Sequence, residues 1–466
     1  MLNILQSILI AVLTPIAKVS SKINDRTRSI CIQILCFILP LNMVYYYIAL
    51  KHTELFFDHL TSHNARHLVG CFCLLLLIFF SLDRIPSKVK WSAWIMYPMI
   101  ICGIWMMVIS FMHPVGDGYR AFAMMLIVAY PCLYLVWNNR GDYENLFDPL
   151  ARAVVLIGII HFIVAFYLAS NGYLAIEIGT GRITGLAQNA NEFAMTGMVA
   201  ACGALYLLVK DRVLGFRFLI YSMALGAGIA IVLMGQSRVS LMVCMLNIVV
   251  AFYFYLRYSE KSKLSVVFLK MVCIAGLVLT MILLSHLCIL VQYSAQEQVN
   301  ASAGIEQSET VESQSEKTSV IDRLDYDENT TLDSYTAGRY HIWKGYMQYM
   351  NLTGNDFSKA NWDVLTQSPV RHAHNNFVEM AYRFGVPLGI LFILLEVIVC
   401  LKALQYLFIN RQKRIVLLWP IIYVVMFLLE SMLDVATLPF ERDAPFFFYL
   451  AIIPMVDMSY QFKRKQ

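Results

Sequence analysis

Arginine and histidine side chains stand beside long apolar stretches at four places in this chain. Residues 336–350 read TAGRYHIWKGYMQYM, and residues 371–376 read RHAHNN. Two earlier motifs, GRITGLAQNAN and GQSR, also border apolar stretches. Charged side chains next to lipid are costly and therefore usually functional. The candidate site residues in these motifs are Arg182, Arg238, Arg339 and His374.

These residue types suit the displacement of a phosphate-bearing leaving group. Arginine is always charged, and its donor fork matches phosphate oxygens, so three arginines form a plausible cradle for a diphosphate. Histidine takes up a proton near neutral pH. Together they indicate attack by a hydroxyl on a sugar that leaves a lipid diphosphate. Plainer interpretations remain open, because such arginines also reach toward lipid headgroups, boundary histidines form structural hydrogen bonds, and asparagines cap helices.

Composition places these motifs in a polytopic membrane protein. Of the 466 residues, 59% are hydrophobic and only 14% are charged, with a mean hydropathy of +0.63, which excludes a soluble domain. We expect an all-α protein, since lipid leaves backbone polar groups no partners outside their own helix. Twelve transmembrane helices are predicted, near residues 29–50, 67–82, 91–113, 119–137, 151–170, 191–209, 216–234, 238–256, 264–291, 385–408, 415–434 and 443–459.

The first residues allow two interpretations of the topology. The stretch 1–17, MLNILQSILIAVLTPIA, is apolar but short and contains Pro15. We expect an interfacial helix there, and a thirteenth span is the alternative. No basic region or small-residue cleavage site marks a removable signal peptide.

Positive charges orient the predicted spans. With both termini inside, the cytoplasmic segments hold 22 of the 36 Lys and Arg residues, and the short outer connections hold six. Cytoplasmic loops retain Lys and Arg, so this excess supports an even number of spans. The net charge of +5 is therefore a topological signal and gives no reason to expect nucleic-acid binding.

All eleven cysteines fall inside predicted spans. The chain has neither a disulfide framework nor zinc-type spacing, so we expect no metal and no cofactor.

One large connection separates the ninth and tenth predicted spans. Residues 292–333 carry ten acids against two bases, which favours a mobile segment. Residues 336–350 place Tyr340, Trp343, Tyr346, Met347 and Met350 at helical spacing, as in an amphipathic helix on the outer membrane face. The expected segments are an N-terminal cytoplasmic or interfacial part (1–28), nine spans (29–291), an extracytoplasmic loop (292–384, acidic over 292–335 and catalytic over 336–384), three spans (385–459) and a cytoplasmic tail (460–466).

The order of the four motifs resembles the bacterial O-antigen ligase and polysaccharide polymerase superfamily. GRITGLAQNAN is followed by QSR at a span entry, then by AGRYHIW and HAHNN, with Gly385 eleven residues after His374. The resemblance covers roughly residues 180–400. The chain departs from the family pattern at two positions. The second glycine of the family's glycine pair, which begins here with Gly385, comes one residue late, at Gly389. Arg383 stands where an acidic residue is frequent in the family.

The resemblance implies a GT-C-like, inverting and metal-independent glycosyltransferase of the inner membrane, with its active site on the periplasmic face. Its donor would be a glycan on undecaprenyl diphosphate, and its acceptor a hydroxyl of a glycan or of a lipid core. Arg238 and Arg339 would hold the diphosphate with help from Arg182, and His374 would activate the acceptor. Candidates for supporting roles are Asn191, Asn375 and Glu379. No role is assigned to Arg371, His372, Arg383 and Arg442.

Two outcomes of this chemistry remain nearly tied. An O-antigen ligase passes the finished chain to the lipopolysaccharide core, whereas a polymerase of O-antigen, capsule or exopolysaccharide passes the growing chain to the next lipid-linked repeat. We favour the ligase slightly. A polysaccharide transporter or flippase is the weaker alternative, because such folds often show internal repeats and we find none.

Overall fold

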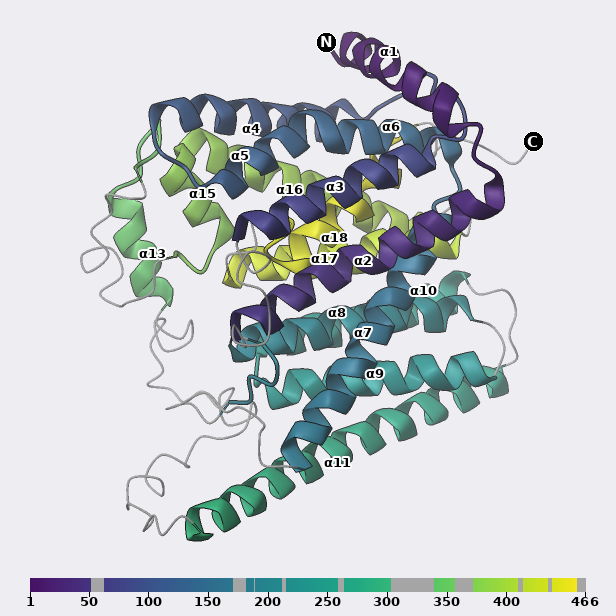
Figure 1. Ribbon diagram of the computed structural model, residues 1–466, viewed down its shortest axis with the longest axis vertical. Helices are drawn as coiled ribbons and strands as arrows, with labels where there is room; N and C mark the ends of the chain where they lie inside the picture. The colour runs from purple at the N-terminus through teal and green to yellow at the C-terminus, as the bar shows by residue number, and fades with distance from the viewer. Residues whose placement is uncertain are drawn as a thin grey trace. The chain divides into compact units, whose positions relative to one another are not determined.

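Helices make up most of the part of the chain that the structure describes (Figure 1). A computed structural model describes residues 1–51, 63–170, 182–187, 189–211, 215–258, 264–302, 339–356, 372–409, 414–434 and 438–458. One isolated β-bridge joins two described residues, Trp91 and Asp457. The predicted all-α class is confirmed.

The first of two compact units consists of residues 1–39, 62–147 and 329–466. Its described helices are α1 (Leu2–Ser20), the first part of α2 (Asp25–Lys51), α3 (His63–Ser81), α4 (Ala93–Met112), α5 (Asp117–Met124), the π-helical turn η2 (Met125–Ala129), α6 (Tyr130–Arg140), α13 (Arg339–Gln348), α15 (Asn376–Phe384), α16 (Val386–Phe408), the 3-10 turn η5 (Ile415–Leu417), α17 (Leu418–Leu433), α18 (Asp443–Ala451) and α19 (Ile453–Val456).

The second unit consists of residues 40–61 and 148–328. Its described helices are the end of α2, α7 (Glu144–Ser170) apart from its first turn, α8 (Ala190–Lys210), α9 (Phe216–Met234), α10 (Arg238–Tyr258) and α11 (Leu264–Ser302). Helices α8 and α9 meet through glycines, since a Cβ on Gly197 would lie 2.5 Å from the carbonyl oxygen of Gly228. Small residues allow this close approach of helices, as they do in many membrane proteins.

Ten of the described helices are long and apolar enough to cross a membrane. Nine of them coincide with predicted spans, and the tenth is α1. The predicted spans at 29–50, 67–82 and 443–459 are largely helical where described but are not among these ten; the first of them lies within the 27-residue helix α2. The C-terminal one is divided into α18 and α19. The protein is therefore an all-α polytopic membrane protein, while the count of twelve spans stays a prediction.

Helix α1 is longer than the sequence suggested. It continues through Pro15 and covers 19 residues, which suffices to cross a hydrocarbon core. Membrane helices tolerate such a proline. One face, with Leu9 and Leu13, is buried, whereas Ile4 and Val12 are exposed. The helix therefore has the dimensions of a span, and the interfacial placement is not confirmed.

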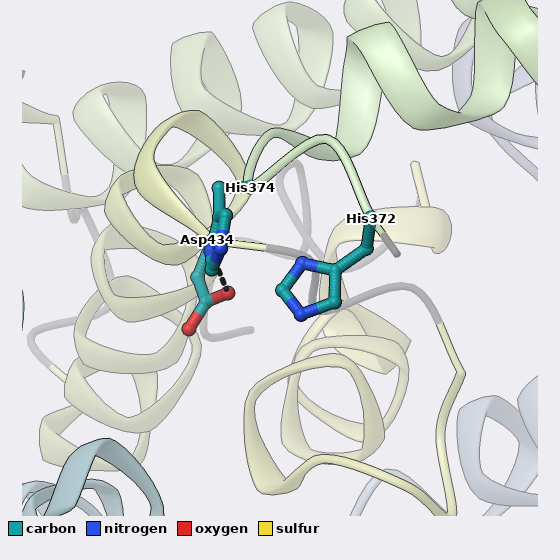
Figure 2. Close-up of side chains that lie close together, drawn as sticks. All are labelled: His372, His374 and Asp434. Carbon is teal, nitrogen blue, oxygen red and sulfur yellow. Dashed lines mark hydrogen bonds and ion pairs between the residues drawn. The ribbon is translucent and has the colours of Figure 1, made fainter. Parts of the chain in front are cut away.

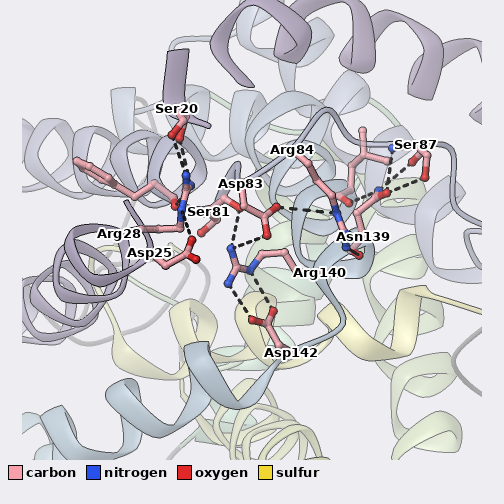
Figure 3. A network of polar contacts seen from close by, with 12 residues as sticks. Ser20, Asp25, Arg28, Ser81, Asp83, Arg84, Ser87, Asn139, Arg140 and Asp142 are labelled. Carbon is pink, nitrogen blue, oxygen red and sulfur yellow. Dashed lines mark hydrogen bonds and ion pairs between the residues drawn. The ribbon is translucent and has the colours of Figure 1, made fainter. Parts of the chain in front are cut away.

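A polar network ties the helix ends of the first unit together (Figure 3). The buried guanidinium of Arg28 donates to the carbonyl oxygens of Ser20, at 2.7 Å, and Phe80, at 2.9 Å. Arg140 at the end of α6 pairs with Asp142 at 2.8 Å and with Asp83 at 3.4 Å. Arg28 therefore links the start of α2 to the ends of α1 and α3, and Arg140 links the end of α6 to the segment that follows α3.

Helix α13 confirms the predicted helix but corrects its apolar face. Ile342 and Tyr346 are buried, and Trp343 and Met350 pack against the same cluster, whereas Tyr340 and Met347 are exposed. The burial follows from packing on α15, where the rings of Tyr346 and Tyr382 meet edge to face at 4.9 Å. This face therefore contacts protein.

The first part of the predicted acidic segment, residues 292–302, is helical. Helix α11 continues to Ser302, eleven residues past the predicted end of the span at 291. Residues 292–302 contain Ala, Gln and Glu, and neither Gly nor Pro, so they sustain a helix. Residues 303–338 lie outside the described part of the chain.

The turn between α15 and α16 depends on Gly385. Its φ of +93° is a backbone conformation that L side chains rarely adopt, and a Cβ there would lie 2.2 Å from the carbonyl oxygen of Leu352. Two hydrogen bonds hold the turn, one from Val386 N to Asn351 O at 2.8 Å and one from the Trp105 indole to Phe384 O at 2.8 Å.

We expect Gly385→Ala to destabilise the first unit. The backbone strain alone costs about 1–3 kcal/mol, and the clash with Leu352 adds to it. Unfolding in detergent micelles, followed by tryptophan fluorescence, measures the loss. Gly276→Ala is the matched control, because a Cβ there meets no atom within 4 Å. Equal stability of the two variants would contradict the role given to Gly385.

Candidate functional site

His374 is held in place by its neighbours at the start of α15. It adopts a φ of +48°, which is uncommon for a residue other than glycine. Asn375 follows as the helix cap, and its side-chain oxygen accepts hydrogen bonds from Phe377 N at 3.0 Å and Val378 N at 3.1 Å. A cap of this kind satisfies backbone donors at the start of a helix. The predicted supporting residue Asn375 thus fixes the backbone that carries His374.

The same segment is bound to the end of α17. The amide of Asn375 donates to Met432 O at 2.9 Å, and the amide of Asn376 donates to the Ser431 hydroxyl at 2.9 Å. The imidazole Nδ1 of His374 lies 3.3 Å from Oδ1 of Asp434 (Figure 2). Three consecutive residues therefore contact the last turn of one helix and the residue that follows it.

Asp434 remains ionised beside His374. Burial by itself raises the pKa of this carboxyl, but the hydrogen bond from His374 and the positive charges of Arg442, His374 and Arg339 hold it well below its usual range. An ionised carboxylate at Nδ1 favours the imidazole tautomer that carries its proton on Nδ1, which leaves Nε2 free to accept a proton. The structure thus also places Arg339, at the start of α13, within electrostatic reach of the His374–Asp434 pair.

A second histidine faces this pair. The ring of His372 lies 4.1 Å from that of His374, measured between centroids, and points toward Asp434 in Figure 2. Burial lowers the pKa of His372 to about 4, and the charge of His374 acts in the same direction. His372 is therefore neutral at physiological pH.

Glu379 and Arg383, in α15, stabilise the segment that carries His374. Glu379 is fully buried, accepts a hydrogen bond from Ala373 N at 2.9 Å and forms an ion pair with Arg383. The Arg383 guanidinium lies 4.8 Å from the centre of the Tyr119 ring. Arg383, the departure from the family pattern, thus neutralises the buried carboxylate that holds the residue before His374.

Arg182 holds a turn in the second unit. Its guanidinium is buried and donates to the carbonyl oxygen of Gly235 through Nε at 3.0 Å and Nη2 at 2.8 Å. Nη2 also donates to Oδ1 of Asn191 at 2.6 Å. Gly235 opens the turn that leads to Arg238, the first residue of α10. Arg182 and Asn191 therefore position the backbone before Arg238, which is itself partly exposed.

The candidates are thus distributed over both units. Arg182, Asn191 and Arg238 belong to the second unit, and Arg339 and His374 belong to the first. A single cavity for the four basic residues stays a prediction.

Sequence reasoning missed Asp434 and His372. Asp434 lies at the end of the apolar stretch that begins after the basic residue Arg414. Because the basic end of a span lies in the cytoplasm, the topology alone would have placed Asp434 on the outer side, where His374 is predicted. His372 stands two residues before His374 without a supporting motif. Among the described residues, one group of three potential metal ligands has its ligand atoms within 4.8 Å of one another, namely His372, His374 and Asp434. The sequence had led us to expect no metal.

Helices and site together define an integral membrane protein with a histidine–aspartate pair at the end of a span. Residues 223–393 match the protein-family model described as O-antigen ligase. This range includes Arg238, Arg339 and His374, and excludes Arg182 and Asp434. The match supports a relation to the O-antigen ligase-like superfamily. That superfamily implies glycosyltransferase-like ligase or polymerase activity on lipid-linked glycans, in the bacterial inner membrane. No curated protein matches the chain.

We expect Arg182→Lys to destabilise the second unit. An ammonium does not reproduce the hydrogen bonds to Gly235 and Asn191, and an unsatisfied buried acceptor costs about 1–3 kcal/mol. Unfolding in detergent measures the change, with Arg152→Lys on the exposed face of α7 as the control. Unchanged stability would contradict the structural role and return Arg182 to direct substrate binding.

Proposed function

We propose that the chain transfers a glycan from undecaprenyl diphosphate to an acceptor hydroxyl in the synthesis of cell-surface polysaccharide. The observation that carries this proposal is the 3.3 Å contact between His374 Nδ1 and the ionised Asp434. With Nδ1–H donating to Asp434, the lone pair of Nε2 faces away from the carboxylate and serves as the general base. Histidine is the side chain best suited to this role near neutral pH.

The reaction is a single displacement. Nε2 of His374 takes the proton of the acceptor hydroxyl while its oxygen attacks the anomeric carbon. The bond from that carbon to the diphosphate oxygen breaks, and the lipid diphosphate leaves with the electron pair. Direct displacement inverts the anomeric centre, and the predicted site offers no pair of catalytic carboxylates for a retaining route.

Arg238 and Arg339 stabilise the departing diphosphate. Guanidinium groups match phosphate oxygens in geometry and neutralise the charge that develops on them, so the transfer itself requires no metal. Loss of one such donor typically costs about 3–4 kcal/mol in the barrier. Arg182 contributes indirectly, since it holds the turn before Arg238.

The acceptor decides between the two forms of the enzyme. We favour an O-antigen ligase acting on the periplasmic face, in line with the description of the matched family model. A polymerase that uses the next lipid-linked repeat as acceptor is the second candidate. The transporter alternative gives no reason for an ordered histidine–aspartate pair.

We expect His374→Ala to abolish most transfer. General-base catalysis contributes roughly 10²–10⁴-fold, so the rate should fall by at least about 10². The measurement compares glycans that stay on the undecaprenyl carrier with those that reach the surface. Long chains stranded on the carrier indicate a ligase, and single repeats indicate a polymerase. His286→Gln, an exposed histidine of α11, is the control, and an unchanged profile for His374→Ala would reject the catalytic assignment and favour a transporter.

We expect Asp434→Asn to lower kcat and leave the KM for the lipid-linked donor nearly unchanged. Asp434 acts through His374, and a neutral amide no longer fixes the imidazole tautomer, a change that costs roughly 10⁴ in kcat in a comparable histidine–aspartate pair. Steady-state kinetics in nanodiscs separates the two constants. Asp117→Asn, on the exposed start of α5, is the control. A rise in KM at constant kcat would instead make Asp434 a substrate-binding group.

A further inference from the structure

The three side chains of His372, His374 and Asp434 have the chemistry of a metal site. Imidazole nitrogens and a carboxylate oxygen are the ligands that zinc uses where three protein groups and one open position surround the ion. Their ligand atoms lie within 4.8 Å of one another. Figure 2 shows His372 and His374 on one loop, with the Asp434 carboxylate beside the His374 ring.

The distances require little rearrangement. Bonds of about 2.0–2.2 Å in a tetrahedral zinc site place neighbouring ligand atoms roughly 3.4 Å apart. His374 Nδ1 and Asp434 Oδ1 are already separated by 3.3 Å. The ligand atom of His372 lies within 4.8 Å of the other two, so it has to approach them by at most about 1.4 Å.

His372 also has an unused nitrogen at this place. Its Nδ1 is buried and has no hydrogen-bond partner among the described residues. Buried polar atoms nearly always have a partner, and an orphan one calls for an explanation. A bound cation would satisfy this nitrogen.

The backbone around the ligands is fixed on both sides. Glu379 accepts the hydrogen bond of Ala373 N, and Asn375 is tied to Met432. Ala373 and Asn375 flank His374, so the ligand-bearing turn keeps its shape independently of a metal. Such supporting contacts raise metal affinity because they orient the ligands in advance.

We propose that His372, His374 and Asp434 bind one zinc-class divalent transition-metal ion, and that the bound ion switches the transferase off. The binding half stands on the cluster alone, whereas the inhibitory half rests on the proposed function.

Inhibition follows from the tautomer of His374. A metal ion on Nδ1 displaces the proton that this nitrogen donates to Asp434. The neutral ring then carries its one proton on Nε2, the atom that has to accept the proton of the acceptor hydroxyl. The base is lost although every residue is still present. The ion thereby competes with the hydrogen bond on which catalysis depends.

Binding is tested without reference to activity. Full-length protein in nanodiscs is stripped with a chelator and titrated with Zn²⁺ by calorimetry, and with Co²⁺ by visible absorption. We expect one site, with affinity reduced at least about tenfold in His372→Gln and in Asp434→Asn. His286→Gln should bind as the unsubstituted protein does, and size-exclusion profiles verify that each variant is folded. Absence of binding, or equal binding by His372→Gln, would overturn the site.

Inhibition is tested on the same samples. We expect Zn²⁺ at the concentration that half-saturates the site to halve transfer, and metal-free His372→Gln to transfer normally and resist this concentration. Unimpaired transfer by the zinc-loaded protein, or a requirement for metal, would overturn the inhibitory half. Failure of transfer in unsubstituted protein both with and without metal would reject the proposed function and leave the binding result standing.

Discussion

The contact between the start of α15 and the end of α17 is the interaction on which the site depends. His374, Asn375 and Asn376 each bind one residue in or just after the last turn of α17, at 2.9–3.3 Å. Asn375 also caps α15, so one side chain serves both the helix and the contact. Because the pairing is fixed at three successive positions, neither helix end shifts without moving the imidazole away from Asp434. The geometry of the candidate site is therefore a property of two segments that lie 60 residues apart in sequence.

Buried charge in this protein is used in two ways. Arg182 donates hydrogen bonds to the carbonyl oxygen of Gly235 and the side-chain amide oxygen of Asn191, and Arg383 neutralises Glu379. Arg339, in contrast, acts electrostatically on Asp434 from the start of α13. A guanidinium has five donors in a fixed plane, so it can tie backbone carbonyls as well as bind an anion. The sequence motif does not reveal which of these tasks a given arginine performs.

The helices and the histidine could be predicted, but the partner of the histidine could not. Apolar stretches foretold nine of the ten described helices that suit a membrane span, because composition and length decide this property locally. The apolar face of α13 was only partly foreseen, since Ile342 is buried through its packing with α15 rather than through contact with lipid. Asp434 was missed because one acidic residue after an apolar stretch carries no motif, and His372 because proximity to another histidine does not show which way a ring points.

The sequence by itself determined the all-α membrane class, and its short motifs pointed to the O-antigen ligase-like superfamily and to His374, because hydrophobicity and short motifs are local properties of the chain. Tertiary structure decided what surrounds that histidine. Only the fold brings Asp434 to Nδ1 of His374 and buries Nδ1 of His372 without a hydrogen-bond partner among the described residues. The fold also makes Arg182 a hydrogen-bond donor to the carbonyl oxygen of Gly235. Such relations depend on distances of a few ångströms between segments far apart in sequence, and hydrogen bonds and ion coordination act only over that range.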